Sequence, residues 1–492
     1  MSTGGSRLAE LPSVVFWLIA VGGMAVAGVG AALGPTTGLA ALAVIGAGLW
    51  ILDRPVRGAY VLVAVVPITA GLRRGLPVPG LRLSEVITVA IAGLILLGPG
   101  RRVRARWEFF DWAALAYVLG HIVLSVVGSK TSGSPLGMGD AGVLTGPAQF
   151  FLMYRALSVC LVDEAERGRV LRAVMWASAP VAILAVLEEI GIPSVVSTLH
   201  SYTGYGLAQG DGQGLLAGQN PQPSAIPRAT SVFPFFQVLS AYMFAVVTLG
   251  TALLLEGDSV MRRRYTAPLT VLAVVGLACT VTATTSIGAL LAVLALGYYH
   301  RRPAAYLVRV LAVTATVLVI FSPLLVTKIG QQSAVTSGAI GSDRPAFVPQ
   351  SVAYRYEIWT NQSLPALSGH FVFGYGPRLP SSVGWRFTET MYMTLLFRGG
   401  VPLVVLWFVL AFAFTHRAYG KTWRAPPAER AASRFLLVAV PILIVLQLSQ
   451  PYFTYGGMTH LLWIAAVVAG PSVANLLRPN ESGASIGWSS PR

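Results

Sequence analysis

The run from residue 234 to residue 255 reads PFFQVLSAYMFAVVTLGTALLL and contains no charged side chain. An α-helix needs about 20 apolar residues to cross the roughly 30 Å hydrocarbon core of a bilayer. Lipid offers no hydrogen-bond partners, so a segment that crosses it alone must bond its own backbone, which only a helix can do. This stretch therefore predicts a membrane-spanning helix.

The composition extends this interpretation to the whole chain. Of the 492 residues, 55% are hydrophobic and only 11% are charged, and the mean hydropathy is +0.68. Soluble globular domains carry roughly 25% charged residues, so a soluble protein of this size would lack polar side chains to cover its surface. The chain is therefore expected to use the bilayer as its solvent.

Similar apolar runs recur along the sequence, and three of them (37–52, 84–98 and 285–299) are short enough to be re-entrant or tilted. We therefore predict an all-α polytopic membrane protein with about 12–14 transmembrane helices. The runs lie near residues 14–33, 37–52, 58–71, 84–98, 111–128, 146–162, 170–190, 234–255, 266–282, 285–299, 304–326, 390–415, 433–449 and 458–476.

The net charge of +16 is distributed in a way that indicates topology. If the predicted helices alternate in direction, the short basic loops all fall on one side, and such loops face the cytoplasm. Basic residues there also attract anionic lipids, and no basic–aromatic ribbon indicates nucleic-acid binding. Both termini are thus predicted to be cytoplasmic. The basic segments are Arg54 with Arg57, 101–106, 163–172, 262–264, 300–302, 416–434 and Arg478.

The same alternation divides the chain into membrane segments and loops, two of which are long and face away from the cytoplasm. Aromatic residues in the second long loop favour a packed cap with short helices. The predicted organisation is 1–190 as N-terminal transmembrane helices, 191–233 as an extracytoplasmic loop, 234–326 as central transmembrane helices, 327–389 as the large extracytoplasmic loop, 390–476 as C-terminal transmembrane helices and 477–492 as a cytoplasmic tail.

Basic residues also occur in segments predicted to face outward, where topology does not call for them. A guanidinium group suits bidentate binding of phosphate or carboxylate. A group of them would fit a lipid-linked pyrophosphate, whereas the alternative partners are phospholipid head groups. These residues are Arg73, Arg74, Arg82, Arg228, Lys328, Arg344, Arg355, Arg378 and Arg386, with Arg398 inside a predicted helix.

Four segments in the second half of the chain stand out by order and spacing. PRATSVF at 227–233 leads into the run quoted above, and TTSIGALL at 284–291 lies in a later apolar run. RYEIW at 355–359 precedes GHFVFGYGP at 369–377, and ETMYMTLLFRGGVP follows at 389–402. Together these segments resemble the O-antigen ligase and polysaccharide-polymerase family.

The resemblance covers roughly residues 220–415, although Ser231 and Ile287 stand where the family usually has Gly and Arg. It implies a metal-independent, GT-C-type glycosyltransferase of the bacterial inner membrane that needs no cofactor. Such an enzyme moves a glycan from a polyprenyl pyrophosphate, such as undecaprenyl pyrophosphate, in the outer leaflet onto a hydroxyl of an acceptor glycan or glycolipid. Polymerase and ligase both remain open.

This chemistry needs a group that stabilises the departing pyrophosphate and a base for the acceptor hydroxyl. Arg228 and Arg355 are the first candidates for the pyrophosphate, and Arg386 is a weaker third. The ligases of this family use a His at the start of the helix after the large loop, but the stretch 386–390 has none. Glu389 is the nearest titratable residue, with a solvated Glu that suits the helix macrodipole as the alternative.

Further candidate substrate-binding residues are Arg344, Tyr356, Trp359 and His370. For His370 the alternative is a purely structural role in shaping its loop. Glu188, at the outer end of a predicted helix, is expected to be solvated.

Two other functions remain open. A flippase for lipid-linked oligosaccharides would suit the helix number, but transporters tend to have repeated halves, and no internal repeat is evident. A non-enzymatic membrane scaffold would leave the outward arginines unexplained.

Overall fold

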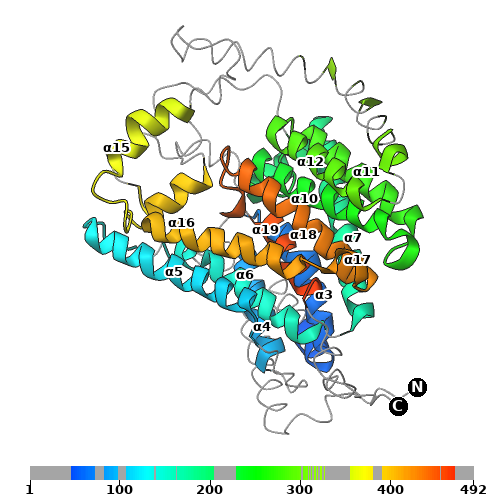
Figure 1. The fold of residues 1–492 in the computed structure, drawn as a ribbon, viewed down its shortest axis with the longest axis horizontal. Helices are drawn as coiled ribbons and strands as arrows, with labels where there is room; N and C mark the ends of the chain where they lie inside the picture. The colour runs from blue at the N-terminus through cyan, green and yellow to red at the C-terminus, as the bar shows by residue number, and fades with distance from the viewer. Residues whose placement is uncertain are drawn as a thin grey trace, which may run out of the picture.

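The computed structural model describes residues 46–72, 82–97, 107–137, 140–161, 163–203, 229–300, 303–308, 355–379, 390–454 and 456–470, with scattered positions from 310 to 326. The described residues are mostly helical and contain no strand (Figure 1). Four of their helical segments are long and apolar enough to cross a membrane: Phe109–Thr131, Glu164–Glu189, Phe236–Leu255 and Met391–Arg424. The predicted all-α polytopic membrane architecture is confirmed.

Each predicted run between 58 and 299, and each from 390 onward, coincides with a helix. The runs at 14–33, 37–52 and 304–326 lie wholly or partly outside the described residues, so the total of 12–14 stays a prediction. The longer helices are α3 (Pro55–Thr69), α4 (Leu83–Leu97), α5 (Phe109–Thr131), α6 (Ala141–Cys160), α7 (Glu164–Glu189), α8 (Pro193–Thr203), α10 (Phe236–Leu255), α11 (Arg263–Cys279), α12 (Ala283–Leu296), α16 (Met391–Ala418), α18 (Pro427–Leu446) and α19 (Met458–Val468).

Several short helices lie between these. They are η3 (Gly257–Ser259), η4 (Gly297–Tyr299), η5 (Trp359–Ser363, a π-helix), α15 (Leu364–Ala366), α17 (Lys421–Arg424) and η6 (Tyr452–Thr454).

The uncharged run at 234–255 forms α10, which lies inside the bundle. Its neighbours are α7, α11, α12, α18 and α19, and 89% of its most apolar window is buried within the protein. A helix that is hydrophobic on every side is expected at such a central position. Figure 1 shows α10 between α11, α12 and α18.

Helices α7 and α18 begin about two turns earlier than hydropathy predicts. α7 starts at Glu164 and not near 170, and α18 starts at Pro427 and not near 433. Their first turns are charged, and the charges pair across helices: Arg167 lies 3.5 Å from Glu429. Segments that hydropathy assigns to loops can therefore be helical, since ion pairs between helices neutralise the charges of their first turns.

Charged groups from distant parts of the chain meet at one end of the bundle. They come from the starts of α5, α7 and α18 and from the ends of α6, α10 and α16, as alternating helix directions require. Arg167 donates to the Val468 and Gly470 carbonyls (3.0 and 2.7 Å). We call this region the ion-pair end; its residues are Glu108, Asp111, Arg155, Arg167, Glu256, Arg417, Lys421, Glu429, Arg430 and Arg434.

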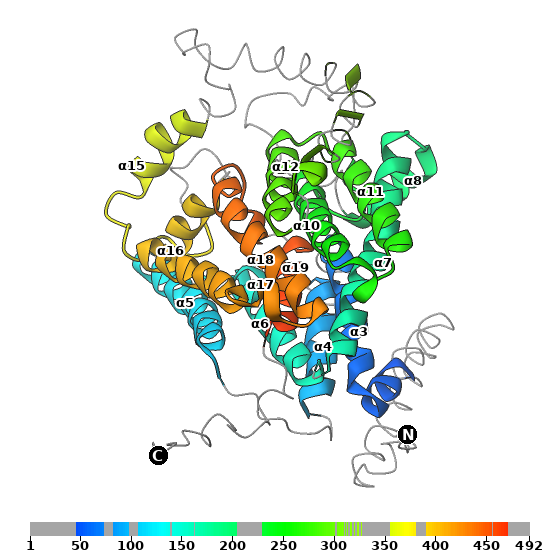
Figure 2. The same cartoon turned by 45° about the vertical axis from the view of Figure 1, so that its right-hand side comes forward.

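The other end of the bundle carries α8 and the segment around α15. Figure 2 shows α8 and α15 in the upper part of the view, with α3 and α4 in the lower part. This end contains the four segments that carry the family resemblance, and the candidate site is therefore sought there.

Candidate functional site

Helix α16 is broken at the glycine pair of the fourth segment. Gly399 has φ −155° and ψ 15°, and Gly400 has φ 68° and ψ −165°. A Cβ atom at Gly400 would lie 2.2 Å from the Val372 carbonyl oxygen. Only glycine fits this backbone conformation and this close approach.

The third segment fills this break. The Phe397 carbonyl accepts hydrogen bonds from the Tyr375 and Gly376 N–H groups (2.6 and 3.1 Å), and the Val401 N–H donates to the Phe371 carbonyl (2.8 Å). Backbone groups released by a helix break need partners of this kind. The Gly-Tyr-Gly turn and the Arg-Gly-Gly break therefore form one structural unit.

The same loop is anchored to neighbouring helices. The Ser132 hydroxyl donates to the Tyr375 carbonyl (3.2 Å). Arg378 pairs with Asp140 (2.9 Å) before the start of α6. These contacts fix the loop against α5 and α6.

The first two segments also meet at this end. The Ala229 N–H donates to the Cys279 carbonyl (3.3 Å), at the turn that leads into α12. The Thr284 hydroxyl, in the second segment, lies 3.3 Å from the Tyr452 hydroxyl. We call this region the motif end; it comprises 229–233, 282–285, 355–377, 390–400 and 447–452.

Arg355 connects the third segment to this pair of hydroxyls. It is half-buried, begins a helical turn that continues into η5, and interacts electrostatically with Tyr452. Burial raises the pKa of Tyr452, and the nearby Arg355 lowers it to a smaller extent. The guanidinium therefore lies near a buried hydroxyl that stays protonated at neutral pH.

The candidate residues divide between the described and the other parts of the chain. Arg228, Arg344, Arg386 and Glu389 lie outside the described residues. The residues that follow Arg228 and Glu389, namely Ala229 and Thr390, both belong to the motif end.

Tyr356, Trp359 and His370 occupy different surroundings. Tyr356 is 66% exposed, and Trp359 is half-buried at the start of η5. The His370 ring stacks on Tyr375 with centroids 4.2 Å apart, and the Tyr375 hydroxyl donates to the Ala366 carbonyl (2.6 Å). These contacts favour the structural role for His370, inside the loop that fills the helix break.

Glu188 corrects one expectation, because it is buried and not solvated. Its carboxylate accepts hydrogen bonds from the Thr230 N–H (2.7 Å), the Thr230 hydroxyl (2.9 Å) and the Ser231 N–H (2.6 Å). His200 Nε2 lies 3.4 Å away. Glu188 thereby holds the chain that directly follows Arg228.

Gln447 belongs to this end as well, although the sequence did not single it out. Its side chain is fully buried, and its Oε1 and Nε2 atoms have no hydrogen-bond partner within the described part of the chain. The Gln447 carbonyl accepts from the Met391 N–H (3.0 Å), which ties it to the start of α16. A polar side chain in an apolar run is the only sequence signal that could have identified it.

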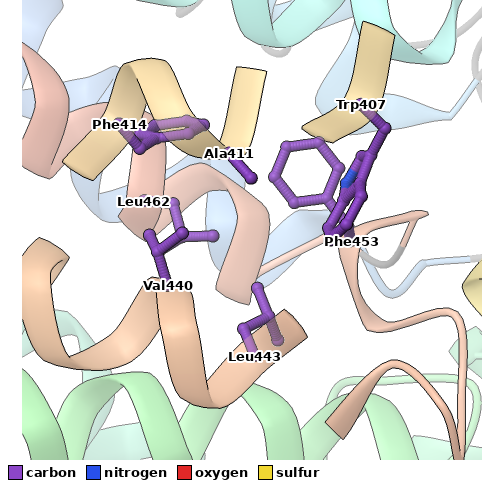
Figure 3. A pocket seen from close by; sticks show the side chains of 7 residues that line it. All are labelled: Trp407, Ala411, Phe414, Val440, Leu443, Phe453 and Leu462. Atoms are coloured by element: carbon purple, nitrogen blue, oxygen red, sulfur yellow. The ribbon is translucent and has the colours of Figure 1, made fainter. Parts of the chain in front are cut away.

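The cavity drawn in Figure 3 does not suit a substrate. It measures about 10 Å³ and is lined by apolar side chains, including Trp407, Phe414 and Phe453. A dry cavity of about one water probe is a packing defect. Among the described residues, no group of three or more His, Cys, Asp or Glu is placed to hold a metal ion, and Cys160 and Cys279 are both free thiols.

Comparison with known proteins gives no closer assignment. A scan against protein-family models found no matching family, and a search of curated proteins found no match.

Proposed function

We propose that the chain is a membrane glycosyltransferase that moves a glycan from a polyprenyl pyrophosphate to a hydroxyl of an acceptor glycan or glycolipid. The reaction would build a polysaccharide or O-antigen, as a polymerase or a ligase. It would take place at the motif end, in the outer leaflet of the bacterial inner membrane.

One observation carries this proposal: the four segments that resemble the O-antigen ligase and polymerase family converge at the motif end. The first three lie tens of residues apart in the sequence, and the fourth follows the third after 11 residues. Direct hydrogen bonds join the first to the turn before the second, and the third to the fourth. Arg355 interacts electrostatically with Tyr452, and the Tyr452 hydroxyl lies 3.3 Å from the Thr284 hydroxyl of the second segment. A chance resemblance would not require these segments to meet.

The chemistry assigns a role to each group. The acceptor oxygen forms a bond to the anomeric carbon while the bond from that carbon to the pyrophosphate oxygen breaks, and the pyrophosphate leaves with the electron pair. Arg355 and Arg228 would stabilise its growing charge, as preorganised donors do in a site of low dielectric constant. Arg386 and Arg344 would bind the donor, and Glu389 would accept the proton from the acceptor hydroxyl. Tyr356 and Trp359 would contact the glycan.

The distribution of charge supports the proposed sidedness. The basic loops used for the topology prediction contribute Arg167, Arg417, Arg430 and Arg434 to the ion-pair end. Cytoplasmic loops are the ones enriched in Lys and Arg. We therefore assign the ion-pair end to the cytoplasm and the motif end to the opposite side.

A flippase is the alternative, and the break in α16 is the feature that favours it. Transporters bind substrates at the ends of interrupted helices. Here, however, the Phe397 carbonyl and the Val401 N–H at the break are both bonded to the chain's own loop. The transferase therefore remains the better-supported function.

The test is an in vitro transfer assay with a polyprenyl-pyrophosphate glycan and the purified protein. Arg355→Ala should lower turnover at least about 100-fold, the usual effect of removing one electrostatic contact to the transition state. Arg424→Ala, an exposed arginine at the other end of the bundle, is the matched control and should keep full turnover. Near-normal turnover in Arg355→Ala would contradict the assignment of the active site to the motif end. Movement of the donor across liposome membranes without glycan transfer would favour the flippase.

A further inference from the structure

Helix α5 carries a line of polar side chains in a segment long and apolar enough to cross a membrane. Tyr117, His121 and Ser125 follow one another at intervals of four residues, so they lie on one face of the helix. All three are buried, with 2%, 1% and 0% of their surface exposed. Polar side chains inside a membrane are costly and often functional.

Two of these side chains lack the partners that burial normally requires. Within the described residues, His121 Nδ1 and Ser125 Oγ are buried and make no hydrogen bond. An unmade hydrogen bond in the interior is more costly than an apolar replacement. The burial of these two polar atoms is explained if a ligand supplies the missing hydrogen bonds.

The charge of an arginine on the neighbouring helix acts on the same face. Arg398 interacts electrostatically with both Tyr117 and His121, and it directly precedes the glycine break of α16. The α5 and α16 helices pack side by side along their length (Figures 1 and 2).

The loop that fills the break brings Ser125 to the same place. A Cβ atom at Gly376 would lie 2.6 Å from the Ser125 carbonyl, and the Gly376 N–H donates to the Phe397 carbonyl, one residue before Arg398. The backbone contact through Gly376 therefore links the polar face of α5 to the break.

We propose that His121, Ser125 and Arg398 form a binding site for a phosphate-type oxyanion between α5 and the broken helix α16. All three side chains can donate: the guanidinium through its fork, the hydroxyl through its rotatable proton and the imidazole through Nδ1–H. At a rise of 1.5 Å per residue, Ser125 and His121 lie about 9 and 15 Å from the Thr131 end of α5. The oxyanion comes from a phospholipid head group drawn into the protein or from a soluble phosphate, and neither source depends on the proposed transfer reaction.

The test measures anion binding through thermal unfolding of the purified full chain in a neutral detergent. One arm adds inorganic pyrophosphate, with sodium chloride at the same ionic strength as its control. The other arm adds phosphatidylglycerol, with phosphatidylcholine as its control. A ligand of the folded state raises the unfolding temperature in proportion to its occupancy.

Three variants and one control test the contribution of each side chain to anion binding. Arg398→Gln should weaken binding of the anion at least about tenfold, as loss of a charged hydrogen-bond donor does. Ser125→Ala and His121→Leu should weaken it severalfold, while without the anion they unfold at the temperature of the wild type or above it. Val123→Ala, a 56% exposed position on the same helix, is the matched control and should bind as the wild type does.

The outcomes separate the two sources and can overturn the site. Stabilisation by phosphatidylglycerol alone assigns a lipid head group, and stabilisation by pyrophosphate assigns a soluble anion. Equal anion affinity in wild type, Ser125→Ala and Arg398→Gln would overturn the proposal, as would the lack of any anion effect on the wild type. A lower unfolding temperature of Ser125→Ala without anion would show that the hydroxyl serves the fold alone.

Discussion

The two ends of the helical bundle use polar residues in opposite ways. At the ion-pair end, Glu256 is buried and receives hydrogen bonds from both Arg430 and Arg434, and buried Arg167 faces Glu429. At the motif end, buried Gln447 leaves both its side-chain polar atoms without a partner in the described structure. A fully satisfied buried network makes a fold rigid, whereas unmet polar groups indicate a place where a ligand completes the bonding.

The arginines illustrate this difference. Arg434 pairs with Glu256 and also packs over the rings of Tyr299 and Trp423 (5.2 and 5.6 Å to the centroids). Arg355, at the motif end, interacts electrostatically with Tyr452, whose buried hydroxyl is uncharged at neutral pH. The ion-pair end thus matches a guanidinium with a carboxylate inside the fold, and the motif end holds a guanidinium near a buried hydroxyl.

The largest expected effect comes from breaking the ion-pair end. Glu256→Gln leaves two arginines without their carboxylate in a buried setting, which should cost about 3–5 kcal/mol of unfolding free energy. Thermal unfolding in detergent measures the loss. Asp53→Asn removes a half-exposed i,i+4 pair with Arg57 and should cost less than about 1 kcal/mol. Equal losses in the two variants would contradict the structural role of the network.

The next effect tests the helix break at the motif end. Gly400→Ala combines a strained backbone with a clash against the Val372 carbonyl and should cost about 3 kcal/mol or more. Gly420→Ala is its control, because Gly420 also has a positive φ (78°) but a Cβ atom added there would meet nothing within 4 Å. That control should cost about 1–2 kcal/mol. Hydrogen exchange of residues 371–376 should rise only in Gly400→Ala.

A smaller effect is expected at Glu188. Glu188→Gln keeps the shape but weakens the bonds to Thr230 and Ser231, so about 1–3 kcal/mol should be lost. The variant should also lower transfer turnover, because the bonded segment directly follows Arg228. Asp163→Asn, which changes an exposed carboxylate just before the other end of α7, is the control for the change in charge. Unchanged stability and turnover in Glu188→Gln would show that this anchor is dispensable.

The smallest effect has the opposite sign. Gln447→Leu removes an amide whose polar atoms find no partner in the described residues, so the variant should be as stable as the wild type or up to about 1 kcal/mol more stable. If the amide serves a ligand, turnover should nevertheless fall. If Gln447→Leu lost as much stability as Glu256→Gln, the amide would stabilise the fold, and the proposed difference between the two ends would be wrong.

The sequence predicts the helices well because each apolar run is long enough to be decided locally. It misplaces the starts of α7 and α18, since hydropathy cannot tell that Arg167 and Glu429 neutralise each other across helices. The glycine pair of α16 is visible in the sequence, but the loop that fills the break comes from residues 371–376 and is a tertiary contact.

The candidate site could be predicted only in part. The sequence indicates Arg355 because the topology of the chain gives no reason for an arginine in a segment that faces outward. The structure places Arg355 at the end where the four segments meet. Tyr452 and Gln447 give no comparable signal, because each is a common polar residue close to an apolar run, and Thr284 stands out only as part of the second segment. Their importance comes from burial and proximity, which only the folded chain supplies.

The central claim is that the motif end binds the pyrophosphate of the lipid-linked donor. The most direct measurement is the affinity of a polyprenyl pyrophosphate for the protein in nanodiscs, compared between wild type, Arg355→Gln and Arg424→Gln. We expect Arg355→Gln to weaken binding at least about tenfold, as loss of a charge-assisted hydrogen bond does, and Arg424→Gln to leave it unchanged. Equal affinity in all three proteins would contradict the account.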